Sequence, residues 1–267
     1  MTSKVRRPEL GRICNVVPSR TENDWTLATA LRVGAVVPLA GVPGSVDLRA
    51  AWWDVGDQKS SGSGVGWAST HAVARYQFVK AGKLGQGEKL SPRCTWMGCK
   101  KADACVNRPQ SFIEQSRTSL KAAVDVLRKL GSVPEAVLPF EIATTMYKGD
   151  ENTFYALAAT RKIASYFNLG KNLAHWRNWL AMHGPLLVGL NIDSTWDHAA
   201  ETAGKLDSFQ PSTIRGGHAV AVVGYTADNR FILMNSWGQD WGDNGYAYAS
   251  EAYIYNGFFN ESYGVTV

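Results

Sequence analysis

Three polar residues stand in short motifs whose side chains could carry nucleophilic catalysis. His218 lies in Gly-Gly-His-Ala-Val-Ala-Val-Val-Gly-Tyr, Asn235 opens Asn-Ser-Trp-Gly, and Gln58 stands in a loop rich in glycine and serine. A histidine can act as a general base, an amide oxygen can orient its imidazole, and an amide N–H can stabilise an oxyanion. Each residue taken alone is more typical of a structural role: a core histidine, a turn former or a loop residue. Their combination and order favour the catalytic interpretation.

The position where a nucleophile would be expected holds Gly64. The run Asp-Gln-Lys-Ser-Ser-Gly-Ser-Gly-Val-Gly-Trp-Ala, from Asp57 to Ala68, leads into a predicted helix. The positive end of a helix dipole lowers the pKa of a thiol placed there. Gly64 stands three residues before Trp67, where such a group would be placed, and supplies only backbone atoms. We do not expect the nearest hydroxyls, Ser61 and Ser63, to replace a thiol, because a hydroxyl is hard to ionise without ideal base geometry.

These motifs, in this order, resemble those of the papain-like cysteine peptidases, particularly bacterial members with the loop Gln-Gly-x-x-Gly-Ser-Cys-Val-Gly. The resemblance spans residues 46–250, and its most specific part is Asn-Ser-Trp-Gly-Gln-Asp-Trp-Gly-Asp-Asn-Gly-Tyr, beginning at residue 235. The resemblance implies one role for each site residue: Gly64 at the vacated nucleophile position, His218 as base and acid, Asn235 as orienter of the imidazole, Gln58 as side-chain donor of the oxyanion hole, and Trp237 as the indole that shields the His–Asn hydrogen bond.

The chain departs from that family pattern at three positions. Lys59 replaces the glycine that usually follows the oxyanion glutamine, and Ser61 stands where many eukaryotic members have a disulfide cysteine. Gly64 removes the nucleophile. Without a thiolate beside it, we expect His218 to be largely neutral near pH 7.

Three functional hypotheses follow, and the sequence leaves them open. The chain is an inactivated form of an active cysteine endopeptidase, a natural pseudopeptidase that binds extended peptides without cutting them, or an interaction module with a vestigial cleft. We favour the first, because a drifting pseudopeptidase would be expected to lose His218 or Asn235 as well. Expected partners are a peptide or protein substrate in the cleft, or a proteinaceous inhibitor. We expect a monomer.

The substrate pocket is less well defined by the sequence than the catalytic residues. We expect Gly216, Gly217 and Ala219, which flank His218, to form part of one wall. The facing wall is expected before a predicted helix, at Ser116–Thr118. Whether residues 1–45 lie over the cleft stays open at this point.

Composition excludes several other classes of protein. The 267 residues carry a net charge of +5, but lysine and arginine are scattered, and their one tight cluster is Lys4, Arg6 and Arg7. No nucleic-acid partner is therefore expected. No stretch is long and apolar enough to span a membrane, and no apolar run follows the basic N-terminal residues as in a secretory signal. A cytoplasmic location and export by a non-classical route both stay open. No cofactor is expected.

The four cysteines, Cys14, Cys94, Cys99 and Cys105, allow several interpretations. Cys94 and Cys99 fall in one predicted helix and lie too far apart along it to bridge. Cys99–Cys105 is the better pairing, and free buried thiols are an alternative. A zinc site fits poorly, because the spacing matches no compact two-plus-two pattern, so no metal is expected.

Helical patterns come first in the chain and β-rich runs come later. This order predicts an α+β fold with two lobes, as in the papain-like family. We interpret residues 1–45 as an irregular lead-in and 46–267 as the peptidase domain, mainly helical over about 46–140 and mainly β over about 141–267. Apolar stripes and capping residues predict helices over 67–81, 119–130 and 172–183. Short β-rich runs predict strands at 186–192, 218–225, 231–235 and 246–249. The active-site cleft is expected between the two lobes.

Overall fold

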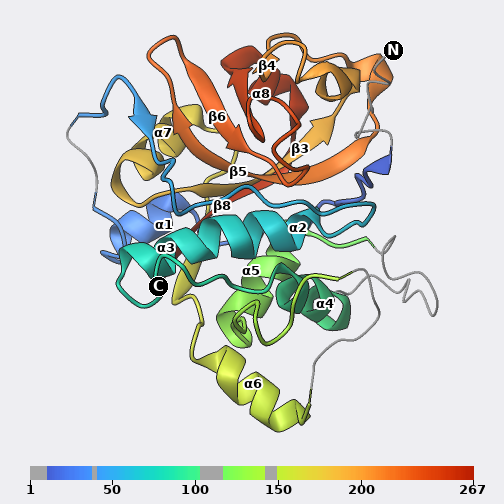
Figure 1. The fold of residues 1–267 in the computed structure, drawn as a ribbon. Helices are drawn as coiled ribbons and strands as arrows, with labels where there is room; N and C mark the ends of the chain where they lie inside the picture. The colour runs from blue at the N-terminus through green and yellow to red at the C-terminus, as the bar shows by residue number, and fades with distance from the viewer. Residues whose placement is uncertain (1–10, 38–40, 103–116, 142–148) are drawn as a thin grey trace, which may run out of the picture.

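A sheet and a group of helices lie on opposite sides of one long central helix (Figure 1). The computed structural model describes residues 11–37, 41–102, 117–141 and 149–267. The sheet is built mainly from the C-terminal half of the chain, and the helices below the central one come from residues 92–159. The fold is therefore α+β with two lobes, as the order of helices and strands predicts.

The sheet of the described residues has eight strands, and β5 (Gly216–Tyr225) lies in its middle. Its main path runs β2-β8-β3-β5-β6-β7-β4, and β1 pairs with β5 off that path. Pairing is antiparallel except between β4 and β7. The other bounds are β1 Val46–Asp47, β2 Ser165–Asn168, β3 Leu186–Ile192, β4 Lys205–Leu206, β6 Arg230–Met234, β7 Tyr246–Ser250 and β8 Phe258–Thr266. The four predicted strands are confirmed as β3, β5, β6 and β7.

Nearly every residue of β5 is buried, because neighbouring strands and the central helix cover it. This is why its sequence reads as an almost continuous apolar run rather than an alternating one. His218 interrupts that run and pairs in register with Leu190 of β3. The sheet therefore holds the histidine backbone rigidly at the boundary with the central helix.

The central helix consists of three consecutive parts, α2 (Gly64–Gly66), the π-helical η2 (Trp67–Ala74) and α3 (Arg75–Lys80). The predicted helix over 67–81 is confirmed and begins earlier, at Gly64. Gly82 follows it at φ +67°, a conformation that favours glycine. A Cβ atom on Gly66 would lie 2.2 Å from the carbonyl oxygen of Pro92, so glycine permits the close approach of α4 (Pro92–Ala102). A wide π turn in a helix is often found near a functional site.

Two further helices begin at capping residues that the sequence analysis identified. Ser119 caps α5 (Leu120–Lys129), Asn172 caps α7 (Leu173–Met182), and both predicted helices are confirmed. No sequence pattern predicted α6 (Glu151–Ala159) or α8 (Glu251–Gly257). Two short 3₁₀ helices, η4 (Ser194–His198) and η5 (Pro211–Thr213), lie between β3 and β5.

The segment before residue 46 is not wholly irregular, as the sequence analysis expected. It contains α1 (Leu27–Arg32), capped by Thr26 and packed through Leu27 and Ala30. The nearby prolines and the Gly/Val-rich stretch favoured irregular structure, so this six-residue helix was not predicted. Propensity is a weak guide for so short an element, because tertiary packing decides whether it forms.

The described residues bear on the expectations about disulfides and metal ions. Cys14 and Cys94 form no disulfide. Cys105 lies outside the described residues, so the Cys99–Cys105 pairing stays a prediction. Among the described residues, no cluster of three or more His, Cys, Asp or Glu side chains could hold a metal ion. None of the helices in the described ranges is long and apolar enough to cross a membrane.

Candidate active site

His218 and Asn235 form a buried hydrogen-bonded pair at the edge between β5 and β6. His218 Nε2 lies 2.9 Å from Asn235 Oδ1, and the backbone N–H of Ser236 donates to the same oxygen over 2.8 Å. Two donors fix the amide with its oxygen toward the imidazole. Since an amide oxygen only accepts, His218 carries its proton on Nε2, and the neutral ring leaves a lone pair on Nδ1.

Burial among aromatic rings keeps this imidazole neutral. The ring centroid of Trp237 lies 5.3 Å from that of His218, and Trp196 lies 6.0 Å away at nearly a right angle. Burial lowers the pKa of His218 to about 4, with Arg215 and Arg12 lowering it further and the Asn235 hydrogen bond opposing them. The expectation of a neutral histidine near pH 7 agrees in direction. Its main cause is burial, whereas the sequence analysis invoked only the missing anion.

Gly64 lies directly beside the free face of the imidazole. A Cβ atom on Gly64 would lie 2.8 Å from His218 Nδ1, 2.6 Å from His218 Cε1 and 3.1 Å from Gln58 Oε1. The backbone therefore presents position 64 to the unprotonated ring nitrogen. The ring also occupies part of the space that a larger side chain would need, so such a side chain requires a shift of His218.

Gln58 is held on three sides at the base of the loop. Its Nε2 donates to the carbonyl oxygen of Ser61 over 2.7 Å, while its Oε1 accepts from Ser236 Oγ over 2.8 Å. Its backbone N–H donates to Ser236 O. The same Nε2 lies 3.4 Å from the carbonyl oxygen of Ile13, so the amide is directed at a main-chain carbonyl from the N-terminal segment. Ser236 is a site residue that the sequence analysis missed, although it follows Asn235 directly.

Residues 12–19, which we call the N-terminal strap, lie across the site. Val16 N donates to Gly217 O, and Val17 N donates to Thr118 O, both over 3.0 Å. Gly217 belongs to β5 and Thr118 precedes α5, so the strap bridges the β lobe and the helical lobe. The question left open by the sequence is thereby answered for these residues: the strap covers the site.

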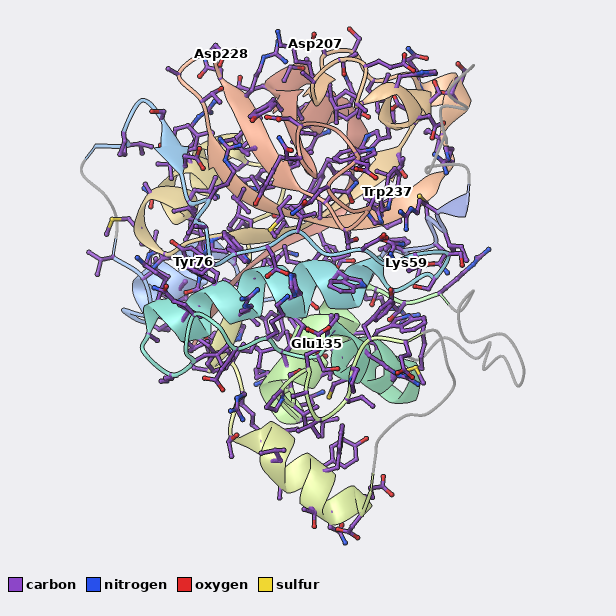
Figure 2. All side chains as sticks on the ribbon, viewed as in Figure 1. Lys59, Tyr76, Glu135, Asp207, Asp228 and Trp237 are labelled. Carbon is purple, nitrogen blue, oxygen red and sulfur yellow. The ribbon has the colours of Figure 1, made fainter. Side chains whose placement is uncertain are left out.

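The two ends of the strap are fixed by charged side chains. Arg12 pairs with Asp57 and donates to the carbonyl oxygens of Lys59 over 2.8 Å and Trp237 over 3.1 Å. Figure 2 shows Lys59 and Trp237 on the same side of the molecule, near the α2 end of the central helix. At the other end, Ser19 donates through its N–H and its hydroxyl to one oxygen of Glu261. No motif in the sequence marks Arg12 or Glu261.

Of the three expected pocket residues, two lie under the strap and the third is buried in the interior. A Cβ on Gly216 would lie 2.2 Å from Cys14 O, and one on Gly217 would lie 2.5 Å from Val16 O, so both glycines lie directly under the strap. Ala219 is 1% exposed and lies in the interior. This burial does not place Ala219 on a substrate-facing surface. Of the expected facing wall, Thr118 contacts the strap, and Ser116 lies outside the described residues.

Comparison with known sequences and structures points to one family. Residues 42–257 match the family model described as papain family cysteine protease. Cathepsin J of Mus musculus is 28% identical over 77% of the chain, and ananain of Ananas comosus is 26% identical over 79%. The chain covers 60% and 56% of those two relatives. Xylellain, a cysteine protease from Xylella fastidiosa, superposes with a TM-score of 0.75 at 22% identity, over 100% of this chain and 99% of that one.

Proposed function

The chain belongs to the papain family of cysteine proteases, and from this we propose that it is a member whose hydrolytic site lacks its nucleophile. The observation that carries the proposal is the position of His218. Its Nε2 is bound to Asn235, while its unprotonated Nδ1 faces the backbone of Gly64. A base positioned by an amide and directed at a helix start is the arrangement that thiol activation requires.

The site residues would divide the reaction in the following way with a thiol at position 64. His218 Nδ1 takes the thiol proton, and the thiolate attacks the peptide carbonyl carbon. With the strap displaced, the Gln58 Nε2 N–H that lies near Ile13 O and the backbone N–H of residue 64 donate to the oxyanion that forms. The imidazolium then gives its proton to the leaving amine, and water hydrolyses the thioester with His218 again as the base. Asn235 holds the ring throughout, and Trp237 excludes water from their hydrogen bond.

With Gly64 in place, the first bond of this sequence cannot form. The backbone N–H of residue 64 remains, because glycine still supplies it. Gln58 Nε2 keeps one N–H on Ser61 O, and its other N–H, which lies 3.4 Å from Ile13 O, becomes available to the oxyanion when the strap is displaced. We therefore propose that the chain as it stands does not hydrolyse peptides. Ser61 Oγ and Ser63 Oγ lie 2.7 Å apart and bond to each other, and Ser61 also donates to Gln58 O, which supports excluding both as replacements.

A second candidate function is peptide binding without cleavage. The strap favours it, because residues of this chain already lie as an extended peptide between Gly217 and Thr118. A foreign peptide or an inhibitory protein segment would use the same main-chain partners and would have to displace the strap. Its side chains would contact Gly216 and Gly217.

The Gly64→Cys variant tests the proposed function. We expect it to cleave an unstructured protein such as reduced casein, and we expect alkylation of the thiol or a second change, His218→Ala, to abolish cleavage. The variant is also made with Val17→Pro, which removes the N–H that binds Thr118, so that strap occupancy does not hide activity. A folded Gly64→Cys/Val17→Pro variant without hydrolytic activity would contradict the proposal.

A further inference from the structure

A small cavity lies beside Asn235, between the central helix and the strands β5 and β6. Its walls include Trp67 and His71 of η2, Met234 of β6, and Ala219 and Asn235. The space open to the centre of a water molecule is about 10 Å³. That is about the minimum that holds a single water molecule, and too little for anything larger.

Three of the residues that line this cavity carry a buried polar atom with no hydrogen-bond partner among the described residues. They are Trp67 Nε1, His71 Nδ1 and Asn235 Nδ2. His71 is 2% exposed and Asn235 is 3% exposed, so bulk water does not reach them. Leaving a buried polar group unsatisfied costs about 1–3 kcal/mol, so three such groups in residues that line one cavity favour a shared partner.

The hydrogen-bonding character of each atom follows from its neighbours. The Trp67 indole nitrogen can only donate. The amide nitrogen of Asn235 donates, because Ser236 N–H and His218 fix the oxygen on the other side. His71 Nε2 lies 2.8 Å from the carbonyl oxygen of Asp54 and must donate to it, which leaves Nδ1 as an acceptor. Burial lowers the pKa of His71 to about 4, so the ring is neutral at neutral pH.

We propose that the cavity binds one ordered water molecule, which accepts from Trp67 Nε1 and Asn235 Nδ2 and donates to His71 Nδ1. Two donors and one acceptor use the two lone pairs and one of the two O–H groups of a single water, within the two to four hydrogen bonds that buried waters make. A cation would face two N–H groups, and an anion would face the lone pair of His71. Charge and size therefore both favour water.

The bound water makes Trp67 and His71 positioning residues for Asn235. A side-chain amide that is hydrogen-bonded only at its oxygen can still rotate about its terminal torsion. Hydrogen bonds at both the oxygen and the nitrogen restrict that rotation. The water thus extends the chain of hydrogen bonds from His71 through Asn235 to His218. This positioning role rests on the proposed function of Asn235, but the water site itself does not.

The first test uses the unmodified chain and does not involve catalysis. A crystal structure that resolves ordered water should show a single density peak in the cavity, within 2.7–3.2 Å of all three atoms. A cavity without density, or an Asn235 amide turned the other way, would overturn the proposal. Hydrolysis by Gly64→Cys can fail while this peak is present, so the two outcomes are distinguishable.

The second test measures the positioning role by NMR. His71→Phe removes the acceptor and fills the cavity. We expect exchange of the His218 Nε2 proton with solvent to become about tenfold faster, which corresponds to the loss of one net hydrogen bond. His183→Phe is the matched control, because His183 is half-buried against Trp179 at the end of α7. Unchanged exchange in folded His71→Phe, or equal changes in both variants, would refute the positioning role.

Discussion

At the residue scale, the site is defined by which atoms of His218 are occupied. Nε2 is engaged by Asn235, and Nδ1 faces Gly64. Burial beside two indoles keeps the ring neutral, which is the protonation state a general base needs. The sequence predicts these residue types and their order, because each stands in a local motif. It could not predict that the imidazole occupies part of the space beside Gly64, because that depends on packing against Trp237 and Trp196.

Gln58 supplies the prediction that belongs at this scale. In the Gly64→Cys background, Gln58→Ala should lower kcat by roughly 10²–10³-fold, because one donor to the oxyanion is lost. The matched control is Gln77→Ala. Gln77 is also buried and donates to a carbonyl, that of His183, but it lies on α3 outside the site. Steady-state kinetics check both variants, and an equal loss in the two would assign Gln58 a structural role only.

At the element scale, the strap and the central helix decide what reaches the site. The helix start was predictable from the Gly/Ser loop, but its π turn and its beginning at Gly64 were not, because no side-chain pattern distinguishes a π turn from an α turn. The strap was unpredictable for a different reason. Its contacts with Gly217 and Thr118 are made by backbone atoms. Since nearly all residue types have the same backbone groups, such contacts produce no recognisable sequence pattern.

The strap leads to a prediction about local stability. Val17→Pro removes the N–H that donates to Thr118 O, so we expect residues 12–19 to open more often. Hydrogen exchange at Val16 should become about fivefold to tenfold faster, as expected for one lost hydrogen bond. Val37→Pro is the control, since Val37 also precedes a proline and is 63% exposed. Unchanged exchange at Val16 would mean that the strap is held elsewhere, at Arg12 or Ser19.

At the scale of the whole molecule, buried histidines link stability to pH. His71 and His218 both have a pKa lowered to about 4 by burial, against about 6.5 in an unfolded chain. Between these values the unfolded state binds more protons, so their contribution is complete above pH 6.5 and lost as the pH falls toward 4. Each contribution is on the order of 3 kcal/mol.

Two carboxylates also make the stability depend on pH. The pKa of Asp54 is lowered to about 2 by hydrogen bonds from Lys89 and Arg75, against the opposing effect of burial. Its stabilisation is present above pH 3.8 and lost as the pH falls toward 2. Burial instead raises the pKa of Glu261, so its protonated form is favoured in the folded state and its contribution is lost as the pH rises above 4.5.

We therefore predict that the free energy of unfolding decreases steadily between pH 6.5 and pH 4. Urea titrations at a series of pH values measure this slope. His71→Asn should flatten it, whereas His198→Asn should not, because His198 is on the surface. A stability that is constant over this range would contradict the burial of the two histidines.

The α+β architecture itself followed from the sequence because strong amphipathic helices and apolar strand runs are local signals. The helices α6 and α8 were not predicted, because they have weaker signals and gain stability by packing on the rest of the molecule. The strand β8 was not predicted either; its Gly264 has no side chain and lets the strand approach the Trp179 ring. The family match over residues 42–257 independently supports the overall interpretation.

The central claim is that the site can activate a thiol at position 64, and alkylation of Gly64→Cys by iodoacetamide as a function of pH tests it most directly. This measurement needs no substrate and uses a reagent small enough to reach a partly covered site. We predict that the thiol reacts rapidly well below pH 8.5, the pKa of an ordinary thiol, because a thiolate–imidazolium pair forms with His218. The double variant Gly64→Cys/His218→Ala should react only as the ordinary thiol ionises. Identical pH profiles for the two folded proteins would contradict the account.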